Sequence, residues 1–459
     1  MEKMNTNNTI IQIRDALSRV NQKVNLIGFV REFSFPRKSL GTDYVSTLKI
    51  VDESYRENEL SVQIFTRKAE DLPMPRSHKD FIILYKVKIT EFNGRLYAVF
   101  NKIFSSYALF DEKSCIDFNP YQASSGFHLL GPDMGFVRRM GHSCSKFPFS
   151  GGMDEYLLSL KDIKSDKPYF DLVCKVLHVE EVTSNVWMLF VWDGNDTPPL
   201  SLDTNLNDEE QNPLPLHIEQ FLLPSDILCT FPCVGTVLRV MTDKAHEKFG
   251  LNFNGIGKWV RFRNMTCEVH FGSWKGLLTS SSRVRYLPEN HDTVLECIRN
   301  FNQRGMGEEG RFPSWSSPPY LAVIDYENVP FATMMDLLTQ PEVGGTVKCI
   351  VRVLAVCPPQ AKDFCNQPVG SDQYRMRLTL EDPTARLHAT LCGDDWVKFF
   401  GDCFSVDVLT TKMNKLLGVP GKEDSDSLRS PPWIKCCINV NSVGYHICGT
   451  RLVDDDVEY

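Results

Sequence analysis

Three segments of this sequence share one strand pattern, and this repeat restricts the chain to a modular, strand-rich fold. Each has an alternating strand that ends in an acidic turn: LKIVDES at 48–54, LFVWDGND at 189–196 and LTLEDPT at 378–384. We predict a hairpin at each turn. A longer apolar strand precedes each one, respectively KVNLIGFVREF, YFDLVCKVLHVEEV and GTVKCIVRVLAV. One structural unit is therefore used three times.

The first unit contains every strand of a five-stranded OB barrel. After its third strand, LSVQIFT, come a short connection, a fourth strand FIILYKVKITEF, the dipeptide Asn93-Gly94 and a fifth strand RLYAVFNKIF. Asn-Gly between two strands favours a type I′ turn, which closes a tight hairpin. The sequence therefore predicts a mainly β fold of three tandem OB-fold barrels with short helices and linkers.

Composition places the boundaries between the units. A chain of 459 residues is too long for one hydrophobic core. We expect a basic first OB fold at 1–115, a linker rich in Gly, Ser, Pro and Phe at 116–150, and a second OB fold at 151–303. A second linker follows at 304–319 and a third OB fold at 320–459. The alternative is that both linkers are long loops inside one large domain.

The net charge of -8 argues at first against a nucleic-acid partner, because phosphate binding needs cationic surface. The charge is unevenly distributed, however. Residues 1–110 hold 17 Lys or Arg and 12 Asp or Glu, a net of +5, so the rest of the chain carries -13. The N-terminal unit is therefore the one suited to bind nucleic acid.

Several other classes of protein are disfavoured. No stretch approaches the roughly 18 apolar residues of a membrane span, and the N-terminus lacks a signal-peptide core, so we expect an intracellular protein without membrane association. The 15 cysteines are scattered through apolar strands without a CxxC pair, which favours a reducing compartment and predicts no metal and no cofactor. Because P-loop, GxSxG and HExxH signatures are missing, we predict no catalytic residue and no enzyme activity.

Phe65 is the first candidate for contact with a nucleobase. Side chains alternate along LSVQIFT, so Val62 and Ile64 point one way while Ser61, Gln63 and Phe65 point the other. An aromatic ring on the polar face can stack on a base, which contributes roughly 1–3 kcal/mol. The alternative is that this ring covers the end of the barrel as part of its core.

The closing hairpin provides a second set of candidates. With a two-residue turn, Phe92 pairs with Arg95 and Thr90 pairs with Tyr97. One face then carries interleaved cations and rings: Lys86, Lys88, Thr90, Phe92, Arg95 and Tyr97. This composition is typical of a groove that follows phosphates and stacks bases. A solvated strand face with incidental aromatic residues is the alternative.

The loop at 31–44 adds a third set. It holds Phe33 beside the cations Arg37 and Lys38, followed by Thr42 and Asp43. An aspartate can accept hydrogen bonds from the amino and imino groups of an unstacked guanine. Alternatively, Gly-Thr-Asp is only a turn and the charges are solvated.

Several of these motifs resemble the protection-of-telomeres family of single-stranded telomeric DNA binders. The resemblance rests on GTDY with LKIVD, VQIF ahead of DLP, and the later YFDLVCKVL, VWDGNDTPP and VRYLPEN, in order over about residues 20–300. YRMRLTLEDPTARLHATLCGDDWVKFF and PPWIKCCINV resemble the third barrel of that family. Only 16 residues separate Cys357 from Tyr374, a compact arrangement similar to that of the plant members.

The resemblance implies a function and a set of contact residues. It implies binding of the G-rich single-stranded telomeric overhang, protection of chromosome ends and regulation of telomerase access, in the nucleus, at the telomere. The third OB fold would contact telomerase and other telomere proteins. Residues at the family's base-contacting positions are Thr42, Asp43, Phe65 and Phe92 in the first unit and Tyr169, His270 and Trp274 in the second. Phe92 stands where the family has tyrosine, and expected loop lysines appear as Ser34 and Leu40.

The plant branch also suggests an alternative function. Some of its paralogues act with telomerase and bind DNA poorly. The alternative is therefore a telomerase-associated factor that uses its barrels for RNA or protein contacts.

Overall fold

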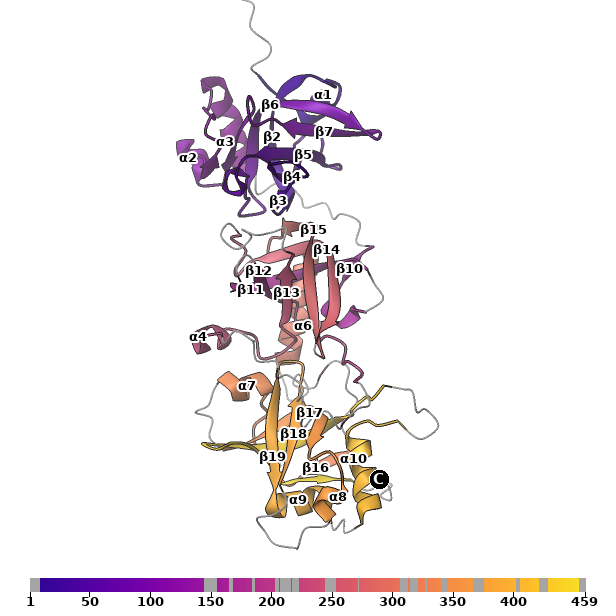
Figure 1. Cartoon of the computed structure of the whole chain (residues 1–459). Coiled ribbons are helices and arrows are strands. Elements are labelled where there is room, and N and C mark those ends of the chain that lie inside the picture. The colour runs from indigo at the N-terminus through magenta and orange to yellow at the C-terminus, as the bar shows by residue number, and fades with distance from the viewer. Residues whose placement is uncertain are drawn as a thin grey trace, which may run out of the picture.

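The computed structural model shows three closed barrels that follow one another along the molecule (Figure 1). It describes residues 9–143, 155–164, 168–183, 186–202, 223–243, 253–270, 272–305, 321–326, 328–339, 345–365, 375–401, 405–420 and 428–453, with Leu206, Leu216 and Pro313. Within these ranges, no helix has the length and apolar composition that crossing a membrane requires.

The strands of barrel one are β2 (Lys23–Ser34), β4 (Tyr44–Val51), β5 (Leu60–Thr66), β6 (Phe81–Phe92) and β7 (Arg95–Phe100). Those of barrel two are β11 (Phe170–Thr183), β12 (Val186–Trp192), β13 (Leu238–Thr242), β14 (Trp259–His270) and β15 (Ser273–Tyr286). Those of barrel three are β17 (Gly345–Cys357), β18 (Arg375–Glu381), β19 (Arg386–Cys392), β20 (Trp433–Asn441) and β21 (Gly444–Cys448).

All three barrels pair their strands in the same order. If the strands of each barrel are numbered 1 to 5 along the chain, strand 1 pairs with strands 2 and 4, and strand 2 pairs with strand 3. Strand 5 lies between strands 3 and 4 and runs parallel to strand 3. This pairing is that of a closed OB barrel, so the predicted fold of three tandem OB folds is confirmed.

Shorter elements surround the barrels. Around barrel one lie β1 (Ile10–Ile11), α1 (Ile13–Leu17), β3 (Arg37–Lys38), η2 (Ala69–Asp71), β8 (Ser106–Phe110), α2 (Ser114–Asp117), β9 (Gln122–Ala123), η3 (Gly131–Asp133) and α3 (Met134–Ser143). Around barrel two lie β10 (Leu157–Leu158), η5 (Leu160–Asp162), α4 (Ser225–Leu228) and α6 (Asp292–Gly305). Around barrel three lie β16 (Ala322–Ile324), α7 (Met334–Thr339), α8 (Lys362–Cys365), α9 (Gly393–Phe400), α10 (Val406–Leu416) and β22 (Thr450–Leu452).

The acidic turn of the sequence repeat has the same structural role in each barrel. Its aspartate accepts a hydrogen bond from the backbone N–H at the first residue of the short helix that precedes strand 1. The three pairs are Asp52 with Ile13 (2.7 Å), Asp193 with Leu160 (2.8 Å) and Asp382 with Met334 (2.7 Å). Each carboxylate also accepts from backbone amides of its own turn. The repeated residue thus ties the turn after strand 2 to the N-terminus of a helix, where backbone donors lack partners within the helix.

The second unit departs from the predicted hairpin. Strand β12 ends at Trp192, but its next neighbour, β13, begins only at Leu238. The hairpin predicted directly after LFVWDGND is therefore wrong, because a long segment is inserted at this turn. Part of the insertion reaches barrel three, where Leu202 and Arg429 exchange two backbone hydrogen bonds of 2.8 Å.

The linker predicted at 116–150 is also wrong for its described part. Strand β9 pairs with β8. From α3, Val137 and Met140 join a hydrophobic cluster with Phe29, Phe81 and Phe110 on the outside of barrel one. Glycine, serine and proline suggested a linker, but the apolar residues between them cover barrel one. Most of the second predicted linker, 304–319, lies outside the described residues.

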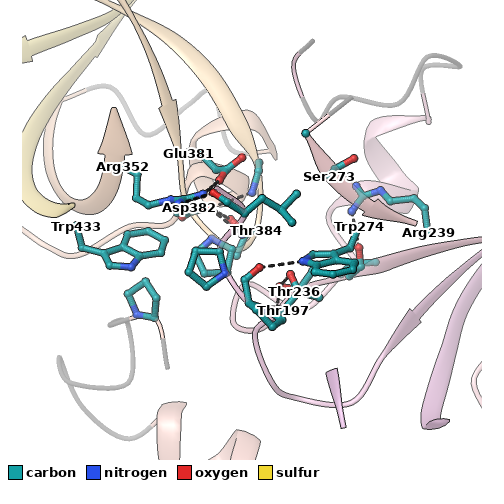
Figure 2. A pocket seen from close by; sticks show the side chains of 18 residues that line it. Thr197, Thr236, Arg239, Ser273, Trp274, Arg352, Glu381, Asp382, Thr384 and Trp433 are labelled. Carbon is teal, nitrogen blue, oxygen red and sulfur yellow. Dashed lines mark hydrogen bonds and ion pairs between the residues drawn. The ribbon is translucent and has the colours of Figure 1, made fainter. Parts of the chain in front are cut away.

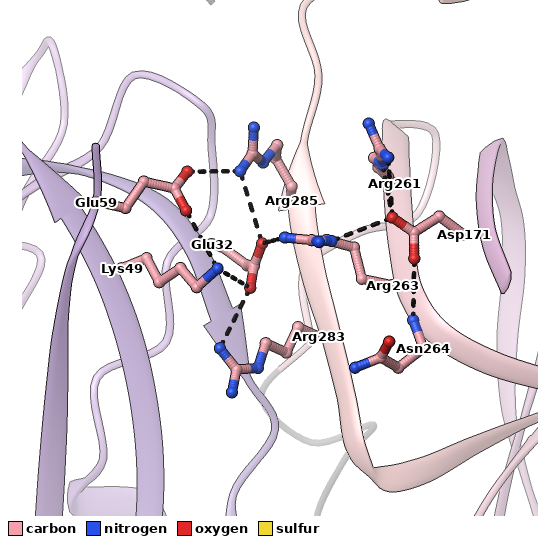
Figure 3. Close-up of polar contacts among 9 residues, drawn as sticks. All are labelled: Glu32, Lys49, Glu59, Asp171, Arg261, Arg263, Asn264, Arg283 and Arg285. Carbon is pink, nitrogen blue, oxygen red and sulfur yellow. Dashed lines mark hydrogen bonds and ion pairs between the residues drawn. The ribbon is translucent and has the colours of Figure 1, made fainter. Parts of the chain in front are cut away.

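Barrels one and two are joined by a shared sheet edge and a cluster of ionic contacts. Strand β15 pairs with the end of β2, placing Arg283 opposite Ser34 and Val284 opposite Phe33. Glu32, whose side chain is fully buried, lies at the centre of four cations (Figure 3): Lys49 at 3.2 Å, Arg263 at 2.8 Å, Arg283 at 3.4 Å and Arg285 at 3.6 Å. Three of these come from barrel two, so the ionic contacts hold the two barrels together.

Barrels two and three meet at a cleft (Figure 2). Arg386 of β19 donates to the carbonyl oxygen of Gly272, in the turn between β14 and β15, at 3.0 Å. Arg352 of β17 donates to the carbonyl oxygen of Leu200 at 3.1 Å and pairs with Glu381 at 2.6 Å. Two tryptophans, Trp274 of barrel two and Trp433 of barrel three, line the cleft.

Candidate nucleic-acid interface

The outer face of β5 presents Phe65 beside polar side chains. Val62 and Ile64 are fully buried in the core, whereas Ser61, Gln63 and Phe65 are half-buried on the opposite face. This is the alternation that the sequence predicts, and it keeps the ring of Phe65 accessible on the outside of the barrel. The alternative, in which Phe65 is core, does not fit this orientation.

The closing hairpin has the predicted register. Phe92 pairs with Arg95 and Thr90 with Tyr97. Asn93 and Gly94 have φ values of 50° and 72°, the left-handed values that a type I′ turn requires at both central positions. The ring of Phe92 is 68% exposed, and Lys88 and Arg95 are exposed on the same hairpin.

These two elements form one continuous surface. Strand β7 pairs in parallel with β5, which places Tyr97 directly beside Ser61. A row of residues therefore crosses three strands, from Thr90 of β6 through Tyr97 to Ser61. Phe65 and Phe92 lie beyond this row on either side, so rings and cations alternate over strands 3, 4 and 5 of barrel one.

The first loop contributes a polar end to this surface. Arg37 pairs with Val45, and Val45 pairs with Phe65, so the register places Arg37 in the row of Phe65. Lys38 lies one residue further along β3 and is exposed. Thr42 is exposed, and both carboxylate oxygens of Asp43 lie 2.6 Å from the Nζ atom of Lys102.

Lys102 is a residue that the sequence reasoning missed. It follows β7 in the chain and lies 59 positions from its partner Asp43. The sequence places it in the fifth strand RLYAVFNKIF, but β7 ends at Phe100, so Lys102 lies in the turn that follows. The structure therefore adds Lys102 to the candidate residues and places it against the carboxylate of Asp43.

The prediction that Phe33 is one of the nucleic-acid contacts of the first loop is wrong. Phe33 is only 1% exposed, because it lies at the end of β2 that pairs with barrel two. Its ring packs 5.9 Å from that of Phe35 and 5.7 Å from that of Tyr286, measured between centroids. Phe33 therefore belongs to the apolar contact between the two barrels.

The candidates on barrel two lie in different places. Tyr169 precedes β11 and is 51% exposed. His270 is exposed at the end of β14, with its Nδ1 atom 3.4 Å from the Nζ atom of Lys275. Trp274 is half-buried in the cleft against barrel three, where its Nε1 donates to the carbonyl oxygen of Pro198 at 2.9 Å (Figure 2). The structure therefore gathers the barrel-one candidates other than Phe33 and places those of barrel two on separate elements.

No metal centre is formed by the part of the chain that the structure describes, since no three His, Cys, Asp or Glu side chains gather there. The cysteines whose side chains the structure describes are free thiols. Burial raises the pKa of several of them, for example that of Cys267 to about 12, which disfavours the reactive thiolate.

Comparison with known proteins decides the family. The model described as "Telomeric single stranded DNA binding POT1/CDC13" matches residues 5–150, and that of the "ssDNA-binding domain of telomere protection protein" matches residues 159–303. A third model, "POT1A-like, OB fold domain", matches residues 317–444. Protection of telomeres protein 1a of Arabidopsis thaliana is 36% identical over 99% of this chain and 100% of its own length. The chain belongs to the protection-of-telomeres family.

Other members of the protection-of-telomeres family match as well. Protection of telomeres protein 1b of Arabidopsis thaliana is 33% identical over 93% of this chain and 92% of its own length. These two relatives support a plant-like member of the family, as the compact third unit predicts. Among solved structures, that of fission yeast Pot1 with ssDNA is 16% identical and covers 64% of this chain and 93% of its own, with a TM-score of 0.27.

Proposed function

We propose that this protein binds the G-rich single-stranded overhang of telomeric DNA, protects the chromosome end and regulates the access of telomerase to it, in the nucleus. The observation that carries the proposal is the outer face of barrel one, where Phe65, Tyr97 and Phe92 alternate with Lys88 and Arg95 over adjacent strands. Stacking rings and backbone-tracking cations are the two elements of single-strand recognition. Family membership adds support, because one family model is described as telomeric single-stranded DNA binding.

Specific contacts would come from the loop end of this face. Phosphate contacts position a strand, whereas contacts to base edges carry its sequence. Asp43 and Thr42 are the polar groups at that end, and a carboxylate accepts hydrogen bonds from the N1 and N2 groups of guanine. The preference for a G-rich strand is therefore assigned to this pair, and the stacking energy to the rings.

The third barrel would serve contacts with telomerase and other telomere proteins. The observation behind this part of the proposal is the family model described as "POT1A-like, OB fold domain", which matches residues 317–444. The surface of this barrel also exposes the apolar side chains of Val406, Val408 and Val443.

The test is a salt titration of binding, followed by fluorescence anisotropy. The purified protein is mixed with a G-rich telomeric oligonucleotide, its complement and a scrambled strand of equal composition. For single strands, log K falls with log salt by about 0.7 per phosphate neutralised, so a face with few cations predicts a slope of about -2 to -4. We expect binding to the telomeric strand at least about tenfold tighter than to either control.

Two results would contradict the proposal. Equal affinity for all three strands with a steep salt slope would remove the claim of specific recognition. No binding at low salt would remove single-stranded DNA as the ligand. A telomerase-associated function through RNA or protein contacts would then be the better account.

A further inference from the structure

The outer face of barrel three carries two arginines on β18 and a histidine on β21, whereas that of barrel one carries aromatic rings on β5, β6 and β7. Along β18, Met376, Leu378 and Leu380 are fully buried in the core, so Arg375 and Arg377 point to the opposite face. Along β19, the core residues alternate in the same way with three outward-facing residues, His388, Thr390 and Cys392.

Strand register assembles these residues into rows. Arg377 pairs with Thr390, and Thr390 pairs with His446 of β21, which forms one row across three strands. Arg375 pairs with Cys392 in the neighbouring row, at the start of β18 and the end of β19. Among the described residues in these rows, none is a carboxylate. Glu381, two rows further on, is already paired with Arg352 at 2.6 Å and Arg386 at 2.7 Å.

His446 indicates that this face has an unmet hydrogen-bonding group. Its side chain is half-buried, and its Nε2 atom is buried without a hydrogen-bond partner among the described residues. A buried polar atom without a partner destabilises the protein, so a ligand that supplies one is favoured.

The face is continuous with barrel two. Arg386, at the inner end of β19, donates to Gly272 in the turn that joins β14 to β15. The same hairpin carries His270 and Lys275 on its exposed side. The hairpin therefore touches the end of β19 at which Arg386 lies, two rows from Arg377 on the same face.

We infer that barrel three extends the binding path, and that its β18–β19–β21 face holds the sugar-phosphate backbone of single-stranded nucleic acid that leaves barrel two. This inference rests on the function proposed above. Strands 2 and 3 of an OB barrel are the usual surface for an oligonucleotide, and in barrel three these are β18 and β19. Because the rows lack aromatic rings, the contacts are to phosphates through Arg375 and Arg377, with His446 as a hydrogen-bonding group. This part of the path therefore adds affinity without adding sequence specificity.

The test uses the full chain and a length series of oligonucleotides. One OB fold covers about 4 to 16 nucleotides, so G-rich strands from about 10 to about 40 nucleotides span one to three barrels. Binding is measured for the wild type, for the double variant Arg375→Gln/Arg377→Gln and for a control with the same charge change, Lys362→Gln/Arg451→Gln. The control residues are exposed on α8 and β22, outside these rows.

The expected result is a length-dependent loss. The double variant should bind short strands like the wild type but the longest strands on the order of tenfold more weakly at 0.1 M salt. Its salt slope on long strands should be shallower by about 1.4, because two phosphate contacts are lost. The control variant should match the wild type at every length.

Wild-type affinity that stops rising before the strand is long enough for barrel three would overturn the inference, and so would a double variant that matches the wild type on long strands. Equal losses on short and long strands would also overturn it, because the arginines would then act on the whole protein. In each of these cases the short strand still binds, so the proposed function stands. Failure of the wild type to bind any strand would refute the proposed function itself.

Discussion

The Nζ atom of Lys102 lies 2.6 Å from both carboxylate oxygens of Asp43. This pair joins the first loop of barrel one to the segment after its last strand, across the end of the candidate binding face. The side chains of both residues are partly exposed, at 32% and 22%. A guanine that donates to Asp43 must therefore share the carboxylate with Lys102 or displace it.

Replacing Asp43 with alanine should mainly reduce discrimination between G-rich and C-rich strands. The carboxylate contacts base edges in the proposed function, and such contacts specify while phosphate contacts position. Binding of both strands is measured for Asp43→Ala, Lys102→Met and the double variant. Since the two side chains are in contact, we expect their effects to be non-additive by roughly 0.5–3 kcal/mol. Equal losses on both strands would count against base reading by Asp43.

Replacing Phe65 with alanine should lower affinity for the telomeric strand by roughly 1–3 kcal/mol, with almost no change in melting temperature. The ring lies on the outer face and supports no core packing. Ile64→Ala is the matched control, because its side chain points into the core and its loss should cost about 2–5 kcal/mol of stability. Thermal unfolding and anisotropy separate the two effects. A large loss of stability in Phe65→Ala would assign that ring to the core instead.

Glu32 should make the stability of the protein depend on pH below about 5. Burial opposes ionisation of this carboxyl, but Lys49, Arg263 and Arg285 outweigh that effect and lower its pKa from 4.5 to about 2. The folded state therefore binds the proton less readily than the unfolded state, and the resulting stability is fully present above pH 4.5. It is lost as the pH falls toward 2.

The measurement compares urea unfolding of the wild type and Glu32→Gln between pH 6 and pH 3. The difference between their unfolding free energies should shrink by roughly 2 kcal/mol over this interval, because only the wild type loses the contribution of an ionised Glu32. Glu57→Gln, at an exposed position on the same barrel, should keep the pH dependence of the wild type. A constant difference between wild type and Glu32→Gln would contradict the assignment.

Replacing Asp52 with alanine should destabilise barrel one by about 1–3 kcal/mol, because the buried N–H of Ile13 and two turn amides lose their acceptor. Asp382→Ala removes the equivalent acceptor in barrel three and should have a similar cost. The neighbouring, exposed Glu53→Ala is the control. Denaturant unfolding provides the measurement, and a cost below about 0.5 kcal/mol for both aspartates would show that the repeated turn is not structural.

The sequence by itself was sufficient for those features that depend on neighbours along the chain. Alternation of side chains places Phe65 opposite Val62 and Ile64, and Asn93-Gly94 sets the register of Phe92 with Arg95. The acidic turns marked three equivalent units, although only the structure shows that their aspartates bind helix N-termini. These features are local because a strand has a period of two and a tight turn has few solutions.

Tertiary structure decided the features that depend on contacts between distant segments. The sequence predicts Phe33 in an aromatic-rich loop, but it lies at the end of β2, where a strand more than 200 residues away in barrel two covers it. Trp274 has the large aromatic ring of a base-stacking residue, yet it lies in a cleft that barrel three helps to line. Lys102 reaches Asp43 only after the barrel has closed. A strand pattern determines which face of a barrel a side chain occupies, whereas the docking of one barrel on another determines whether that face remains open to a ligand.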